Sequence, residues 1–184
     1  MAKIRIPDQA KLFVGMLSSE PDLFEECVAL FANEFGPVDQ ESAAVPWTNT
    51  SYYEPEMGNG LLRKFVFFEQ LIDPGTLAGI KLLTNGIEEH KARKTSGGLN
   101  RRINLDPGYL TEAKVVLASA KDFAHRVYIG ENIYAEVTLR YDNACSSFLP
   151  LDYTFPEYRS DDLRSLFTTA RESLRKGLGK KHRA

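Results

Sequence analysis

The sequence has little of the chemistry that marks extracellular or membrane proteins. Its two cysteines, Cys27 and Cys145, have neither C-x-x-C spacing nor a disulfide framework, so we expect two free thiols and a reducing, cytoplasmic location. The longest apolar runs, KLFVGML and FVFF, are far shorter than the roughly 20 residues that cross a bilayer. The N-terminus also lacks the apolar stretch of a secretory signal. We therefore expect no export and no membrane partner.

Motifs of established enzyme classes are missing as well. No G-x-x-x-x-G-K-[ST] loop is present to cradle phosphates, which excludes a Ras-like GTPase mechanism, and no G-x-S-x-G string marks a nucleophilic serine. The three histidines, His90, His125 and His182, show no paired spacing, which argues against a structural zinc site. No motif therefore names a reaction, and candidate residues have to come from the expected fold and from charge.

What the chain does contain is typical of one folded domain. Its 184 residues are 43% hydrophobic, 11% aromatic and 26% charged, which is the balance of an ordinary globular protein. A chain of this size buries roughly 70% of its unfolded surface, so it needs no metal or disulfide to hold a core. We expect a single domain over residues 1–176 and a flexible basic tail over residues 177–184.

Charge is distributed unevenly along the chain. Residues 18–60 hold nine acidic side chains and no Lys or Arg, whereas residues 90–102 hold five Lys or Arg and no acid. The basic stretch and the basic tail are either solvated surface or a surface that collects phosphates or nucleic acid. The formal net charge of -2 argues against a dedicated nucleic-acid binder, which usually has a basic domain.

The pattern of apolar residues predicts an α+β fold. Over the first 110 residues the order of elements is βαββαβ, which is typical of a ferredoxin-like sheet with both helices on one face. The expected elements are a buried strand at 12–17, a helix from Pro21 to Gly36, a strand at 41–47, a loop or irregular hairpin at 48–60, a strand at 61–71, a helix from Asp73 through Ile87, a basic loop that contains Gly97 and Gly98, and a strand at 101–110 in which Pro107 and Gly108 turn the chain.

The remaining sequence predicts an antiparallel β-meander that extends this core, followed by a C-terminal helix. The meander strands are expected at 113–119, 125–130 and 133–141. Residues 142–158 contain two prolines and are expected to form a surface loop. The last helix is expected to begin at Ser160 and to end with basic residues at Gly177.

In four ordered blocks, the chain resembles a bacterial family of unknown function whose members are often automatically labelled "GTP-binding protein". The blocks are YYEPEMG (52–58), RRINLDPGYL (101–110), HRVYIGENIYAEVTL (125–139) and TFPEYR (154–159). The resemblance spans residues 11–174. It implies no established activity and no site residues, and the missing phosphate loop argues against the label as a description of GTPase chemistry.

The expected strand at 101–110 carries the strongest group of polar side chains. If Ile103 and Leu105 face the core, Arg102, Asn104 and Asp106 project together from the other face. Arg102 could then hold a phosphate or carboxylate, Asn104 could orient a substrate oxygen, and Asp106 could act as a base or bind Mg²⁺. The alternative is a turn in which Asp106 accepts local backbone N–H groups and Arg102 is merely solvated.

A second candidate pair lies in the expected hairpin. A two-residue turn at Glu131 and Asn132 makes His125 and Glu136 diagonal neighbours, which suits general acid/base catalysis. Arg126 points to the opposite face of a regular strand, so it joins the same site only if a bulge intervenes. The alternative for the pair is a surface contact of little energy.

Together these residues predict a binding site for a phosphorylated small molecule or a nucleotide, with phosphoester hydrolysis or transfer as the natural reaction class of an enzyme. The expected catalytic residues are Asp106, His125 and Glu136, of which Asp106 and Glu136 are also the expected Mg²⁺ ligands. The expected ligand-binding residues are Arg63, Arg102, Asn104, Tyr109, Lys121, Arg126, Tyr53 and Glu56. The alternative function is a non-catalytic RNA- or protein-binding adaptor, and the sequence leaves cofactor and oligomeric state open.

Overall fold

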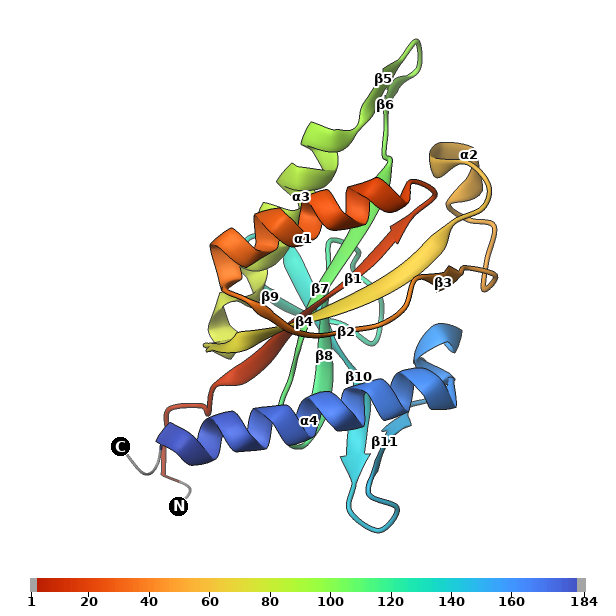
Figure 1. The fold of residues 1–184 in the computed structure, drawn as a ribbon. Coiled ribbons are helices and arrows are strands. Elements are labelled where there is room, and N and C mark those ends of the chain that lie inside the picture. Colours follow the sequence, from red (N-terminus) through yellow and green to blue (C-terminus); the bar gives the residue numbers. More distant parts are fainter. Residues whose placement is uncertain (1–2, 182–184) are drawn as a thin grey trace.

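The structure is a computed structural model that describes residues 3–181. A large antiparallel sheet forms its centre, in the strand order β11-β10-β8-β7-β1-β4-β2, with β3 paired to β4 and β9 paired to β10 (Figure 1). The strands of this sheet are β1 (Ala10–Ser18), β2 (Val38–Glu41), β3 (Val45–Pro46), β4 (Leu62–Ile72), β7 (Ile103–Leu110), β8 (Lys114–Ser119), β9 (Val127–Gly130), β10 (Ile133–Asp142) and β11 (Ser147–Pro150). A separate hairpin consists of β5 (Arg93–Thr95) and β6 (Gly98–Asn100).

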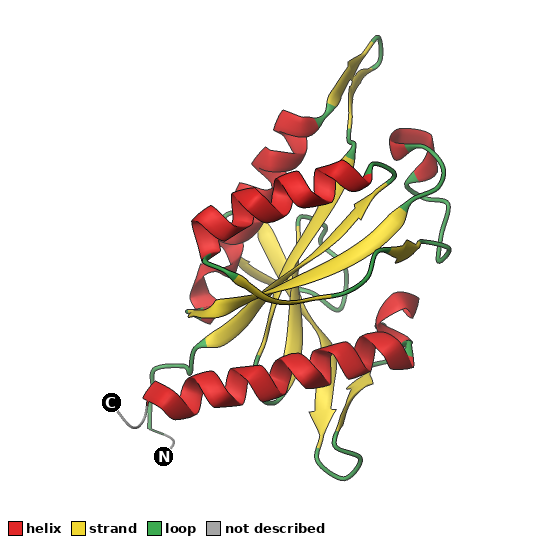
Figure 2. Ribbon diagram, viewed as in Figure 1, coloured by secondary structure: helices red, strands yellow, loops and turns green. Residues whose placement is uncertain are grey.

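Helices cover both faces of the sheet (Figure 2). The helices are α1 (Pro21–Phe35), the short α2 (Glu54–Met57), α3 (Leu77–Lys91) and α4 (Asp161–Lys181), with 3-10 turns at Pro74–Thr76 and Pro156–Arg159. α1 and α3 pack on one face, while α4 packs on the other (Figure 1). Because both faces are covered, every residue of β1 is buried, which confirms the predicted central strand.

Alternation along β1 divides the core between the two faces. Leu12 and Val14 point to the α1 side, where they join the cluster of Phe31. Phe13 points to the α4 side, where its ring packs edge-on against Phe167 with the ring centroids 4.9 Å apart. A strand that contributes side chains to a core on each face has a strongly fixed register. A shift by one residue would move the side chains of each face into the core on the other face.

The predicted fold class is confirmed in its main features, since the protein is a mixed α+β structure with a large antiparallel sheet and a C-terminal helix. The ferredoxin-like description stays a prediction. Cys27 and Cys145 are both free, as expected. The predicted end of the last helix at Gly177 is wrong, because apolar side chains on both sides of it, Leu174 and Leu178, continue to pack on the core. Residues 182–184 of the expected tail lie outside the described residues.

Three segments that were predicted as loops contain regular structure. These are residues 142–158, which contain β11, the basic loop around Gly97 and Gly98, which contains β5 and β6, and residues 48–60, which contain α2. In the first of them Phe148 is fully buried against the α4 face. Turn-forming residues dominate these segments locally, but burial against distant parts of the chain fixes β11 through Phe148 and α2 through Met57. β5 and β6 are largely exposed instead and pair with each other as a hairpin.

The predicted turn at Pro107 and Gly108 is wrong, because β7 continues through both residues to Leu110. β7 pairs with β1 along its whole length, but it pairs with β8 only over Gly108–Leu110. In this register the backbone nitrogen of residue 107 faces β8, and a proline has no N–H to donate there. Pro107 therefore ends the β7–β8 ladder, and the two strands diverge from this point.

Gly108 lies where β7 packs tightly against β8 and against β1. A Cβ atom at this position would overlap the carbonyl oxygen of Val116 and would lie 2.5 Å from a ring carbon of Phe13. We predict that Gly108→Ala lowers the free energy of unfolding by about 1–3 kcal/mol, because neither the backbone nor a buried ring can move aside without cost. Urea denaturation measures this loss.

Gly86→Ala is the matched control for this substitution. A Cβ atom at Gly86 meets nothing within 4 Å in the described structure. Alanine also favours a helix over glycine by roughly 0.5–1 kcal/mol, so we expect this variant to be at least as stable as the wild type. A Gly108→Ala protein that matches the wild type in stability would contradict the close approach of the two strands.

Candidate functional site

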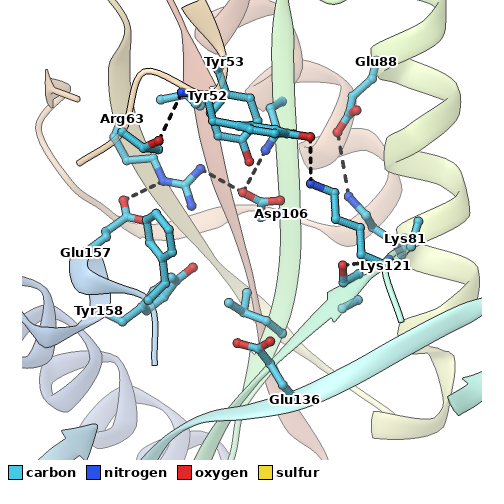
Figure 3. A pocket seen from close by; sticks show the side chains of 18 of the residues that line it. Tyr52, Tyr53, Arg63, Lys81, Glu88, Asp106, Lys121, Glu136, Glu157 and Tyr158 are labelled. Atoms are coloured by element: carbon cyan, nitrogen blue, oxygen red, sulfur yellow. Dashed lines mark hydrogen bonds and ion pairs between the residues drawn. The ribbon is translucent and has the colours of Figure 1, made fainter. Parts of the chain in front are cut away.

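The divergence of β7 and β8 opens a cavity of about 490 Å³, which is large enough for a small-molecule ligand (Figure 3). Its walls come from β7, β8, α3, the loop before α2 and the 3-10 turn before α4. Nine charged and six aromatic side chains line it. A cavity with this composition offers both charged groups and ring faces to a ligand.

Two side chains of α3 replace the missing strand partner of β7. The buried carboxylate of Glu88 accepts a hydrogen bond from the Leu105 N–H at 2.7 Å, and the buried Nζ of Lys81 donates to the Leu105 carbonyl oxygen, also at 2.7 Å. Lys81 and Glu88 lie two helical turns apart, hence on one face of α3, and their charged groups are 3.8 Å apart. The N–H and carbonyl groups of Leu105, which β8 leaves unpaired, are thereby satisfied while the gap stays open.

A buried ion-pair network forms one wall of the cavity. Arg63 on β4 is only 5% exposed, and it donates from Nε to Glu157 Oε1 at 2.8 Å and from Nη1 to Asp106 Oδ2 at 3.0 Å. Asn104 Nδ2 donates to the same oxygen of Asp106 at 2.8 Å. The guanidinium lies over β1 at Gly15, where a Cβ atom would come within 2.9 Å of Nη2, so a residue without a side chain is needed there.

The two carboxylates that contact Arg63 differ in acidity. Burial opposes the ionisation of Asp106, but the charges of Arg63 and Lys81 and two hydrogen bonds outweigh it and lower the pKa of this carboxyl. At Glu157 the effect of burial is larger than that of the Arg63 charge, so the pKa of this carboxyl is raised. The Asp106 side chain is also 30% exposed, and its Oδ1 has no hydrogen-bond partner in the described part of the chain. Asp106 is thus an ionised carboxylate with one oxygen open to the cavity.

Arg101, rather than Arg102, joins this network. Arg101 donates to Asn104 Oδ1 at 2.8 Å and holds both oxygens of Glu56 at 2.8 and 2.7 Å. Arg102 turns away, pairs with Glu20 and does not line the cavity. The prediction that Arg102 projects with the other two polar residues of its strand is wrong, because β7 begins only after it and the alternation does not extend back that far.

His125 and Arg126 both reach Glu136. His125 Nε2 lies 3.0 Å from Glu136 Oε2, and Arg126 Nε donates to the same oxygen at 2.8 Å. The predicted two-residue turn forms, but β9 begins only after Arg126, so the two side chains are not held on opposite faces of a strand. The other oxygen of Glu136 accepts from Thr138 Oγ1 at 3.3 Å. The predicted contact between His125 and Glu136 is therefore present. Both oxygens of the Glu136 carboxylate already have hydrogen-bond partners.

The mouth of the cavity is aromatic and carries one free positive charge. Lys121 has no carboxylate partner among residues 3–181, unlike the other cations that line the cavity. Its Nζ donates to the Tyr52 hydroxyl at 3.3 Å and lies 4.6 Å from the centre of that ring. Tyr52 and Phe123 are 63% and 51% exposed. Such a mouth attracts anions and offers flat rings for stacking.

The charge asymmetry of the sequence is largely neutralised within the molecule. Basic side chains of residues 90–102 pair with acidic side chains of residues 18–60. The pairs are Lys91–Glu26, Arg93–Glu20, Arg102–Glu20 and Arg101–Glu56. These contacts leave little positive charge free for a phosphate backbone. The RNA-binding alternative gains no support from them and stays a prediction.

Most of the predicted site residues lie at the cavity, although their roles stay predictions. Those that line it are Tyr53, Arg63, Asn104, Asp106, Lys121, Arg126 and Glu136. Those that contact a lining residue from outside are Glu56 and His125. Tyr109 lies apart from them, because it shares the strand face of Leu105 and packs in the apolar cluster of Leu77 on α3.

The expected Mg²⁺ ligands are not gathered into a ready metal site. No group of three or more metal-ligating side chains occurs in the portion of the chain that was described. The side chains of Glu136 and Asp106 lie well apart in Figure 3. Since both oxygens of Glu136 accept hydrogen bonds, Asp106 Oδ1 is the carboxylate oxygen best placed for a cation, and the Mg²⁺ site stays a prediction.

Several residues of the site were absent from the sequence-based predictions. The pair on α3 had a detectable signal, since Lys81 and Glu88 share the helical face of Leu77, where charged side chains are unusual. Glu157 and Tyr158 stand in a short segment that looked like a loop, and nothing local indicates that both are buried against Arg63.

Fold and cavity together define an α+β protein with a charged, aromatic-rimmed pocket at a gap in its central sheet. The chain belongs to the family described as Domain of unknown function (DUF4416), whose model matches residues 8–174. This agrees with the expected membership of a family of unknown function and does not bear on the "GTP-binding" label. No curated protein and no solved structure matches the chain. Within residues 3–181, no helix is both long and apolar enough to span a bilayer.

The Asp106 carboxyl makes the stability of the protein depend on pH. Its pKa is lowered in the folded state, so ionisation favours folding above the ordinary value of 3.8, and this contribution is lost as the pH falls through the native pKa. We predict that Asp106→Asn lowers the free energy of unfolding by about 1–3 kcal/mol at pH 7. The difference in unfolding free energy between the variant and the wild type should shrink in strong acid, where Asp106 is protonated. Urea denaturation at pH 7 and in strong acid measures it.

Asp122→Asn is the control for this experiment. Asp122 is exposed, so its replacement should change stability by no more than about 0.5 kcal/mol at either pH. An Asp106→Asn variant whose deficit is the same at pH 7 and in strong acid would show that the charge of Asp106 does not stabilise the fold.

Proposed function

We propose that the protein binds a phosphorylated small molecule, of the size of a nucleotide or sugar phosphate, in the cavity between β7 and β8. The observation that carries this proposal is Lys121, an ammonium group without an acidic partner in the described structure, at the mouth of a cavity of about 490 Å³. The exposed rings of Tyr52 and Phe123 supply faces for a base or sugar beside it.

The other cations of the cavity support placing the phosphate at Lys121. Arg63 contacts two carboxylates, Arg101 holds Glu56 with two hydrogen bonds, and Arg126 contacts Glu136. An anion at any of these would have to compete with a carboxylate that is already in place. The expected anion contacts at Arg63 and Arg102 are therefore weaker candidates than Lys121.

Phosphoester hydrolysis or transfer is the reaction class that suits the remaining groups. Asp106 supplies an open carboxylate oxygen, which could take a proton or contact Mg²⁺. His125 and Glu136 form a hydrogen-bonded pair that could transfer a proton. Glu136 lines the cavity, whereas His125 contacts Glu136 from outside it. Adding Mg²⁺ to the binding experiment below tests the metal separately from the ligand.

We also propose that the part of the chain from β1 to β7 is a ferredoxin-like unit. The support is the antiparallel order β7-β1-β4-β2 together with two helices, α1 and α3, on one face. β8, β10 and β11 extend this sheet beyond β7, so the cavity lies at the join of the two parts. A cytoplasmic location is proposed from the two free thiols.

Thermal unfolding with a panel of nucleotides and sugar phosphates, with and without Mg²⁺, tests the binding proposal. A ligand at 100 times its dissociation constant stabilises the folded state by about 2.7 kcal/mol, which raises the Tm of a protein of this size by roughly 5–10 °C. Ala120→Trp should abolish the shift, because Ala120 is exposed and lines the cavity, where an indole would block the mouth.

Ala113→Trp is the matched control, because Ala113 is also exposed and flanks β8 but does not line the cavity. It should keep the full ligand-induced shift. A panel in which no phosphorylated compound changes Tm would overturn the proposal, and so would a shift that Ala120→Trp leaves intact.

A further inference from the structure

Charge is divided unevenly between the inner wall of the cavity and its mouth. Three cations on the inner wall, Arg63, Lys81 and Arg101, contact four carboxylates. These carboxylates are Glu56, Glu88, Asp106 and Glu157. The mouth carries the free ammonium of Lys121. The inner wall therefore has no positive charge to spare for a phosphate, whereas the mouth has one.

Polar groups without partners gather on the inner wall. Asp106 Oδ1, the Tyr53 hydroxyl and the Asn85 amide line the cavity, and none of them hydrogen-bonds to another described residue. The Tyr158 hydroxyl is fully buried in a side chain that is 2% exposed, and it meets no donor or acceptor of the described chain in hydrogen-bonding geometry, although the Arg63 charge is near. Buried groups of this kind normally have partners.

These groups suit the hydroxyl groups of a ligand. An ionised carboxylate only accepts hydrogen bonds, while a phenol and an amide can donate and accept, so together they match neighbouring hydroxyls that also do both. A phosphate is an acceptor with negative charge, and beside Asp106 it would face a second anion in a site of low dielectric. The chemistry of the inner wall therefore selects the end of the ligand that carries no phosphate.

We propose that the ligand enters with its hydroxyl-bearing end first, so that a sugar ring donates hydrogen bonds to Asp106 Oδ1 while the phosphate stays at the mouth on Lys121. This inference rests on the proposed function and narrows it to phosphate monoesters of sugars or nucleosides. The part of the ligand between these two contacts lies along the rings of Tyr52 and Tyr53, which meet edge to face with their centres 5.1 Å apart.

Binding of matched pairs of compounds tests this orientation. The pairs are AMP and adenosine, GMP and guanosine, ribose 5-phosphate and ribose, and glucose 6-phosphate and glucose, each titrated by calorimetry into the wild type. For the tightest pair, Lys121→Gln should weaken the ester about 10-fold and leave its dephosphorylated partner unchanged. Lys114→Gln is the control, because Lys114 is exposed at the far end of β8 and outside the cavity.

Asp106→Asn should act differently, weakening both members of the pair by the same factor of about 10. Tyr53→Phe gives a second measurement if that variant is poorly folded, since it removes only a hydroxyl without a partner among the described residues. It should weaken both members equally, by a smaller factor. The two kinds of variant thus separate the phosphate contact from the hydroxyl contacts.

The possible failures are distinguishable. If none of the four esters binds the wild type, this inference fails; the proposed function fails with it only if no other phosphorylated compound of the thermal panel changes Tm. If esters bind but Lys121→Gln weakens both members of a pair equally, or Asp106→Asn weakens only the ester, the proposed function stands and the orientation is overturned. A dephosphorylated partner without measurable affinity also overturns it, because the inner wall would then contribute no binding of its own.

Discussion

The two hydrogen bonds at Leu105, one donated by Lys81 to its carbonyl oxygen and one accepted by Glu88 from its N–H, are the interaction on which the site depends. A strand edge inside a protein must have its N–H and C=O groups satisfied, and the simplest partner for β7 would be a longer β8. Pro107 ends that ladder, and the helix side chains satisfy the next backbone groups instead. The cavity is therefore built into the central sheet, between two strands held in fixed positions, and loops complete its mouth.

The charged groups of the cavity are more easily explained by a ligand than by stability. A buried ion-pair network is costly to desolvate, and apolar side chains of similar volume usually stabilise a fold as well or better. Here Arg63, Asp106 and Glu157 occupy a gap that apolar side chains could fill, and one oxygen of Asp106 remains open. Groups kept in such a state fit a site whose binding energy comes from completing their hydrogen bonds.

The sequence supports the α+β class, the buried central strand and the contact between His125 and Glu136, because each rests on local periodicity or a short turn. It misplaces features that depend on distant partners. The Pro107–Gly108 pair has a strong turn signal, yet it lies inside a strand because β1 pairs with it throughout. Arg102 was expected to face the site, but Arg101 contacts Asn104 there and Arg102 pairs with Glu20 instead. The reason is that β7 begins only at Ile103, so the alternation of the strand does not include either arginine.

The most direct test of the central claim, that the gap between β7 and β8 is a ligand site, is a titration followed by backbone amide chemical shifts. Ribose 5-phosphate and AMP are added to ¹⁵N-labelled protein. We expect the largest shift changes at the Leu105 amide, which donates to Glu88, and at residues 117–121 across the gap, with β11 and α4 unchanged. Changes confined to the β5–β6 hairpin or to α4 would contradict the account.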